Sequence, residues 1–325
     1  MLMTAISEEM CMNVEAKLRP LRGIIPPMAT PLASIDCLDL PGLEALIEHV
    51  LGGGVHALFI LGTTGEGPAL GYGLRRELIE RVCRQVGTRV PVLVGITDTA
   101  YVESLHLAEV AARAGASAVV VAPPFYFQVS QSDILRLIEG LANESALPLY
   151  LYNQPELTKT SFSPQTVARA SEMSNVWGLK DSSGEICYIK EVLALVGNKP
   201  EFSVLVGPEH LLAEALLCGA HGGVPGGANI FPALPVRLYQ AFLDGRHKEM
   251  QELQAQMIRI GLPIWNAGET EPGHLRRLKC ALSVLGLCSG LPTWPCQQAT
   301  ADERKQIEEH LKQHGILPGH AMASS

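Results

Sequence analysis

Eight short apolar runs, separated by stretches with helical spacing, constrain the fold of this 325-residue chain more than any other feature. Each run is continuous and rich in Val, Ile and Leu, which is typical of strands buried on both faces of a parallel sheet. Their spacing of roughly 20 to 35 residues predicts an α/β fold, a (β/α)₈ TIM barrel with a C-terminal helical extension. The predicted strands lie in residues 23–32, 56–67, 90–98, 116–126, 147–155, 176–184, 202–209 and 221–229. A doubly wound open sheet is the alternative, because the eighth run is rich in glycine.

Three segments follow from this pattern. Residues 1–21 carry acidic side chains where a secretory signal would carry basic ones, so we interpret them as an N-terminal arm. Residues 22–230 are expected to form the barrel. After residue 230 only helical patterns remain, and no low-complexity linker precedes them. We therefore expect residues 231–325 to form a helical extension that packs on the barrel.

Charge and motif content argue against several classes of partner. The formal net charge of −8 gives no electrostatic reason to expect nucleic acid or an anionic membrane. The apolar runs are shorter than the roughly 20 residues of a membrane helix, and we expect a cytoplasmic protein. Paired-ligand spacing is absent at His49, His56, His106, His210, His221 and His274, and no C-x-x-C pair occurs, so we expect no metal ion. Neither a Walker loop nor a pyridoxal-phosphate cradle is recognisable, and we expect no cofactor.

Polar side chains follow four predicted strands, at the edge where a barrel holds its active site. They are Thr63, Thr64 and Gly65 after the second strand, Tyr126 after the fourth, Tyr152 and Asn153 at the fifth, and Lys180 on the sixth. An average lysine would lay its methylenes on apolar surface and keep its ammonium in water. On a barrel strand, Lys180 would instead point into the barrel mouth or the helix layer, where burial lowers the pKa and frees a nucleophilic amine. Taken singly, the tyrosines could be rim aromatics and the Thr-Thr-Gly segment a turn.

Four motifs occur in matching order on these strands: GTTGE (62–66), PPFYF (123–127), YLYNQP (150–155) and GLKDSSG (178–184). Together they resemble the dihydrodipicolinate synthase and N-acetylneuraminate lyase superfamily, over about residues 22–317. The resemblance implies a class I aldolase, lyase or dehydratase that forms a Schiff base with pyruvate or another 2-oxo acid. It also implies a homotetramer built as a dimer of dimers.

The resemblance implies four catalytic residues. Lys180 matches the lysine that forms the Schiff base, and Tyr152 matches the phenol that moves protons. Thr63 matches the hydroxyl that links Tyr152 to a second tyrosine. Tyr126 matches this second tyrosine, which in the family reaches into the site of a neighbouring subunit.

Five further positions are predicted to bind substrate. Thr64, with the backbone amides of both threonines, matches a nest that binds the substrate carboxylate, and Gly65 belongs to the same segment. Val224 matches the residue whose backbone carbonyl faces the site. We also expect Asn153 to bind substrate. Glu156 could bind a polar substrate tail or lie in solvent.

The loop after the fifth strand departs from the synthase pattern. Dihydrodipicolinate synthases read Y-N-x-P-x-R-T-G, and their arginine holds the carboxylate of aspartate semialdehyde. Here YNQPELTKT places Leu157 at the arginine and Lys159 at the glycine. This favours an aldolase that cleaves a 4-hydroxy-2-oxo acid, such as a 2-keto-3-deoxy sugar acid or sialic acid, to pyruvate and an aldehyde. The alternatives are a Schiff-base dehydratase, a dihydrodipicolinate synthase, and a ligand-binding barrel without turnover.

Overall fold

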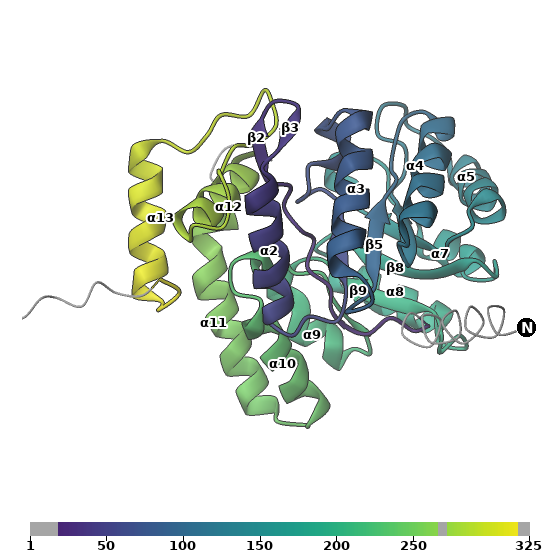
Figure 1. The fold of residues 1–325 in the computed structure, drawn as a ribbon. Helices are drawn as coiled ribbons and strands as arrows, with labels where there is room; N and C mark the ends of the chain where they lie inside the picture. Colours follow the sequence, from purple (N-terminus) through teal and green to yellow (C-terminus); the bar gives the residue numbers. More distant parts are fainter. Residues whose placement is uncertain (1–18, 266–271, 318–325) are drawn as a thin grey trace, which may run out of the picture.

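Eight parallel strands form the centre of the computed structural model, which describes residues 19–265 and 272–317 (Figure 1). The strands are β1 (Gly23–Ile24), β4 (Leu58–Ile60), β5 (Val92–Gly95), β6 (Ala118–Val121), β7 (Leu149–Asn153), β8 (Val176–Asp181), β9 (Ser203–Val206) and β10 (Gly222–Gly223). Their order in the sheet is β1-β10-β9-β8-β7-β6-β5-β4, and every neighbouring pair is parallel.

Backbone hydrogen bonds beyond the sheet's two edges close the barrel. The amide of Met28 donates to the carbonyl of Phe59 at 2.8 Å, and the amide of Phe59 donates to the carbonyl of Pro26 at 3.0 Å. The predicted (β/α)₈ barrel is therefore confirmed, and the open-sheet alternative is wrong. An antiparallel hairpin of β2 (Leu32–Ser34) and β3 (Cys37–Leu38), which was not predicted, follows β1.

Helices follow the strands and surround the barrel (Figure 1). They are α2 (Leu40–Gly52), α3 (Tyr72–Val86), α4 (Tyr101–Ala114), α5 (Gln131–Glu144), α6 (Pro155–Thr158), α7 (Pro164–Ala170), α8 (Ile186–Val196) and α9 (Leu212–Leu217), with the 3₁₀ turns η1 (Gly67–Ala69), η2 (Glu209–Leu211) and η3 (Gly226–Asn229). Serine and aspartate caps begin several of them. Ser130, for example, forms a capping box with Asp133 at the start of α5.

Four helices complete the described chain: α10 (Ala233–Leu243), α11 (His247–Trp265), α12 (Pro272–Val284) and α13 (Ala301–Gln313). α10 contacts β1 and α9, as the eighth helix of a barrel does, and the boundary predicted at residue 230 lies between β10 and this helix. α11, α12 and α13 stack to one side of the barrel, with α13 outermost (Figure 1). Of the predicted N-terminal arm, residues 1–18 lie outside the described residues.

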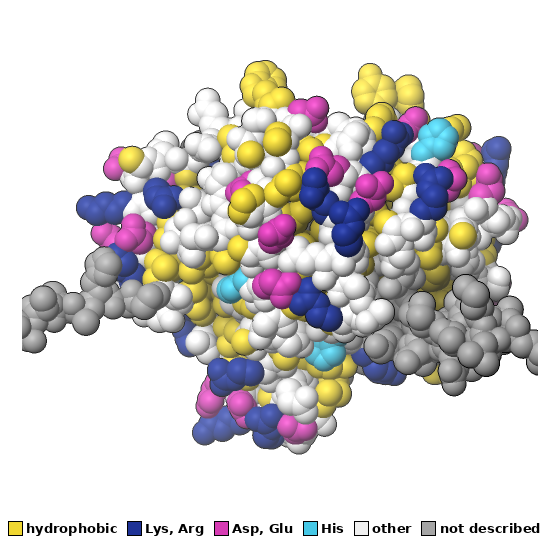
Figure 2. Space-filling view, in the orientation of Figure 1, with side chains coloured by type: hydrophobic (Ala, Val, Ile, Leu, Met, Phe, Trp, Pro, Cys, Tyr) yellow, Lys and Arg dark blue, Asp and Glu magenta, His cyan; other side chains and the backbone are white. Residues whose placement is uncertain are grey.

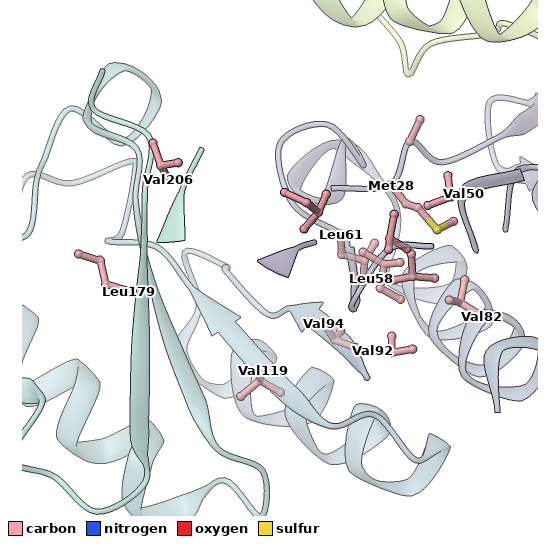
Figure 3. Close-up of a cluster of buried hydrophobic side chains, with 14 of the residues drawn as sticks. Met28, Val50, Leu58, Leu61, Val82, Val92, Val94, Val119, Leu179 and Val206 are labelled. Atoms are coloured by element: carbon pink, nitrogen blue, oxygen red, sulfur yellow. The ribbon is translucent and has the colours of Figure 1, made fainter. Parts of the chain in front are cut away.

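The sheet separates two hydrophobic cores. Val92 and Val94 of β5 face the outer core between strands and helices, which also contains Val119 of β6 (Figure 3). Leu93, between the two valines, belongs to the inner core that fills the barrel. This alternation explains the continuous apolar runs, because each strand needs apolar side chains on both faces.

The same alternation orients the strands that carry the predicted catalytic residues. Leu151 faces the outer core, whereas Tyr152 lies in the inner core. On β8, Leu179 faces the outer core, so Lys180 points into the barrel. The register pairs Tyr152 with Lys180, which places the two side chains next to each other on the inner face.

Acidic and basic side chains are interspersed over α2 and α3 on the face shown in Figure 2. Arg89 pairs with Glu48, and Arg81 pairs with Glu77, both at 2.7 Å. Within residues 19–265 and 272–317, no helix has both the length and the hydrophobicity needed to cross a membrane.

Close backbone packing explains the glycine-rich eighth strand. A Cβ atom on Gly222 would lie 2.0 Å from the carbonyl oxygen of Gly23 in the neighbouring strand β1. Because backbone atoms cannot move aside as a side chain can, only glycine fits where β10 runs beside β1.

We predict that Gly222→Ala lowers the free energy of unfolding by about 3 kcal/mol, because it overpacks the contact between β10 and β1. Gly73→Ala is the matched control, since a Cβ there meets no atom within 4 Å. Calorimetric melting should show a lower Tm for Gly222→Ala and an unchanged or slightly higher Tm for Gly73→Ala. Equal melting of Gly222→Ala and the wild type would contradict the steric explanation.

Candidate active site

The amine of Lys180 lies inside the barrel between two aromatic rings. Its Nζ is 4.0 Å from the ring centroid of Tyr152 and 5.0 Å from that of Phe59. Only 6% of the residue is exposed. Burial lowers the pKa of Lys180 from 10.5 to about 7, although the negative charge of the neighbouring Asp181 opposes this shift. A large share of the amine is therefore neutral near pH 7, as a nucleophile requires.

Asn153 and Asp181 lie on the opposite face of the same two strands. The Asn153 side chain donates to Asp181 Oδ1 at 2.7 Å and accepts from the amide of Phe162 at 3.0 Å. It is fully buried and lines neither of the cavities described below. The prediction that Asn153 binds substrate is thus corrected: because it follows Tyr152 on a strand, it faces away from the barrel interior and ties β7 to β8.

Tyr152 and Thr63 form the hydroxyl pair that was predicted. The phenol oxygen and Thr63 Oγ1 are 3.0 Å apart, and either can be the donor. Tyr126 does not join this pair within one chain. It is 77% exposed, its ring packs edge-on against Phe127, and it lines neither cavity.

A cavity of about 270 Å³ opens above Lys180. Its floor contains Lys180, Tyr152 and Thr63, as expected from the carboxyl ends of barrel strands. The described residues that line the cavity are Pro27, Thr63, Thr64, Tyr152, Gln154, Lys180, Ser182, Gly207, Pro208, Glu209, His210, Val224, Gly226, Trp265 and His274. The size suits a small organic acid better than a large ligand.

The turn after β4 carries two threonines that line this cavity. Within the described part of the chain, the backbone amides of Thr63 and Thr64 donate no hydrogen bond to another backbone or side-chain group. Amides in such a turn can bind a carboxylate. Gly65 does not reach the cavity: it is buried, and a Cβ there would lie 2.9 Å from the Met28 carbonyl oxygen. Gly65 therefore allows close packing of the turn. Val224 does line the cavity.

Glu209 is a buried acid on the cavity wall that sequence reasoning missed. Burial raises its pKa to about 7, against the lowering effect of hydrogen bonds from Trp265 Nε1 at 2.5 Å and the Gly227 amide at 2.8 Å. Its position directly after β9 is a signal that could have identified it, as is the position of His210.

Trp265 and His274 bring side chains of the C-terminal helices to the same wall. They lie at the end of α11 and the start of α12, and their ring centroids are 6.0 Å apart. No strand pattern indicates them, because they reach the barrel only through the packing of the extension.

Leu157 lines a second cavity, of about 210 Å³, which shares Thr63, Tyr152 and Gln154 with the first. Its lining is largely apolar and includes Phe59, Leu61 and Phe125. Glu156 is exposed and lines neither cavity. Of the two alternatives for this residue, the structure therefore shows a side chain in solvent. Lys159 is also exposed and has a left-handed φ of 54°, a conformation that suits the glycine expected at this position.

Among the residues that the structure describes, no three His, Cys, Asp or Glu side chains gather into a group that could bind a metal ion.

Comparison with known proteins identifies the family of this chain. The model of the dihydrodipicolinate synthetase family matches residues 20–314. YagE of Escherichia coli K12, which is named as a proposed 2-dehydro-3-deoxy-D-gluconate aldolase, is 36% identical over 69% of this chain and 74% of its own.

Two solved structures are similar over nearly their whole length. Dihydrodipicolinate synthase from Bacteroides thetaiotaomicron has a TM-score of 0.87 and 48% identity, over 90% of this chain and 99% of that one. The structure of YagE in complex with pyruvate has a TM-score of 0.87 and 30% identity, over 92% and 100%. The chain therefore belongs to the dihydrodipicolinate synthetase family, a family of Schiff-base-forming carbon–carbon lyases.

Proposed function

We propose that this enzyme is a class I aldolase that cleaves a 4-hydroxy-2-oxo acid to pyruvate and an aldehyde, and that Lys180 forms the Schiff base. One observation carries the proposal. A buried amine with a pKa of about 7 lies 4.0 Å from the ring of Tyr152, whose hydroxyl is paired with Thr63 at the floor of a cavity. The pyruvate bound in the YagE structure supports this choice of product.

The proposed reaction begins when the neutral amine of Lys180 attacks C2 of the substrate, and loss of water leaves an iminium ion. The amides of Thr63 and Thr64 hold the substrate carboxylate. The Tyr152 hydroxyl gives its proton to the departing water, and the resulting phenolate accepts the proton of the 4-hydroxyl while the C3–C4 bond breaks. The bonding electrons move to the iminium and form an enamine, and the aldehyde leaves. Protonation of C3 and hydrolysis then release pyruvate and restore the lysine.

We infer that the aldehyde part is a polar sugar chain. Glu209 and His274 on the cavity wall carry polar groups that can bond its hydroxyls, and Trp265 holds the Glu209 carboxylate in place. Leu157, at the position of the synthase arginine, has an apolar environment that does not suit the carboxylate of aspartate semialdehyde. The proposed activity of YagE agrees with a 2-keto-3-deoxy sugar acid. Dihydrodipicolinate synthase is the second candidate, because a chain of 48% identity bears that name.

We further propose that Tyr126 completes the site of a neighbouring subunit in a homotetramer. Tyr126 and Phe127 are 77% and 73% exposed, on the loop between β6 and α5. Two large aromatic side chains this exposed on one loop are typical of a surface that another protein chain covers.

Reductive trapping tests the imine. Incubation with pyruvate and cyanoborohydride should yield a stable adduct on Lys180, located by peptide mass mapping, and none in Lys180→Arg. Because attack needs the neutral amine, the trapping rate should rise through pH of about 7 and then level off, whereas an ordinary lysine would still gain reactivity toward 10.5. Glu209→Gln is the control, because the Glu209 carboxyl also has a pKa of about 7. If Lys180 causes the rise in trapping rate, this variant should show the same rise with pH. An adduct only at Lys159 would refute the mechanism.

Product analysis tests the substrate class. We expect a 2-keto-3-deoxy sugar acid to be cleaved to pyruvate with a kcat/KM about 100-fold above that for sialic acid, because the wall groups must pair with the hydroxyls presented. A 2-oxo acid that retains every substrate carbon would indicate a dehydratase instead. Faster condensation of pyruvate with aspartate semialdehyde would indicate the synthase, and Leu157→Arg should increase that condensation at least about tenfold.

Mixing two inactive variants tests the shared site. Tyr126→Phe keeps Lys180, and Lys180→Arg keeps Tyr126, so dissociation and reassembly of the mixture should restore part of the activity. The recovered sites would combine Lys180 of one subunit with Tyr126 of its neighbour. Subunit exchange without any recovery would argue that Tyr126 acts within its own chain or not at all.

A further inference from the structure

A buried ion pair lies behind the turn that carries Thr63 and Thr64. It joins Glu66, at the end of this turn, to Lys279 in the middle of α12. The two side chains are 2% and 1% exposed. The pair therefore connects the predicted carboxylate-binding turn of the barrel to the C-terminal extension.

Both charged groups have further partners, and these also come from the extension. The amide and hydroxyl of Thr293 donate to Glu66 Oε2 at 2.6 and 2.7 Å. Lys279 Nζ donates to the carbonyl of Leu291 at 2.8 Å. Burial lowers the pKa of Lys279, and the charge of Glu66 opposes this shift. Glu66 is thus bound by helix α12 and by the segment that follows this helix.

The backbone of the turn depends on where Glu66 is held. Glu66 has a left-handed φ of 55°, a backbone conformation that residues other than glycine rarely adopt. Its amide donates to the carbonyl of Thr63 at 2.9 Å, and the next amide, of Gly67, donates to Gly62 at 3.2 Å. A backbone shape of this kind persists only where its surroundings hold it. The ion pair with Lys279 and the hydrogen bonds from Thr293 hold the side chain of Glu66, two residues after Thr64.

We propose that Lys279 and Glu66 are positioning residues, and that the extension uses them to keep the amides of Thr63 and Thr64 aimed at the carboxylate of the 2-oxo acid. The inference rests on the proposed function of this turn. A buried ion pair is a poor means of adding stability, because apolar residues of similar volume often serve as well. A positioning role accounts for the ion pair, because the pair fixes the turn of the barrel against helix α12 of the extension.

Pyruvate binding in three variants tests this role. Glu66→Gln and Lys279→Met each leave one buried charge without its partner, so both should lower the Tm. The double variant has no buried charge and should recover most of the Tm. All three should raise the pyruvate Kd, measured by calorimetry, at least about tenfold, because a misaligned amide loses a hydrogen bond to a charged group. A purely structural defect would reduce the folded fraction and leave the Kd of the folded protein unchanged.

Arg276→Met is the matched control. Arg276 lies one turn before Lys279 on α12 and pairs with Glu303 of α13 at 2.7 Å, away from the turn. It should alter the Tm without changing the pyruvate Kd. Recovery of the Kd together with the Tm in the double variant, or an unchanged Kd in the single variants, would overturn the proposal. Reductive trapping of the same samples separates a failure of the proposed imine from a failure of this inference. A wild type that binds pyruvate without forming an adduct would refute only the imine, whereas one that does not bind pyruvate would refute the turn's role and this inference together.

Discussion

The orientation of one lysine inside a closed barrel is the constraint on which the rest of the site depends. Successive side chains of a strand face opposite sides of the sheet, so a leucine that packs on the helices at position 179 requires Lys180 to point inward. The interior offers the amine aromatic rings in place of water, and its pKa falls to about 7. The register of β7 and β8 then places Tyr152 beside it.

The outward face of the same strands supports this arrangement. Asn153 and Asp181 occupy the next register position and are joined by a hydrogen bond of 2.7 Å, and Ser183 adds two further donors to Asp181. These contacts link the ends of the two strands that carry the amine and the phenol. Groups held in this way need little rearrangement when substrate binds, which is how a fold contributes to rate.

The barrel and the extension contribute different parts of the site. The strands provide the floor, where the chemistry common to the family is expected to occur. Helices α11 and α12 provide Trp265 and His274 at the wall, and Trp265 bonds the buried Glu209. Through Lys279 the same extension also reaches the turn of Thr63 and Thr64. Packing of the extension can therefore influence which substrates fit without changing the floor.

The barrel and the residues at the floor of its cavity could be predicted from the sequence, because strand periodicity and strand-end motifs are local properties of the chain. The same alternation could have shown that Asn153 faces away from Tyr152, and Glu209 after β9 could have been found by applying the strand-end rule to every strand. Other features had no local signal. The need for glycine at position 222 arises from the approach of β1, and Trp265, His274 and Lys279 reach the site from helices far along the chain. These features follow from tertiary packing, because such contacts depend on how distant segments pack and not on the order of residues within any one segment.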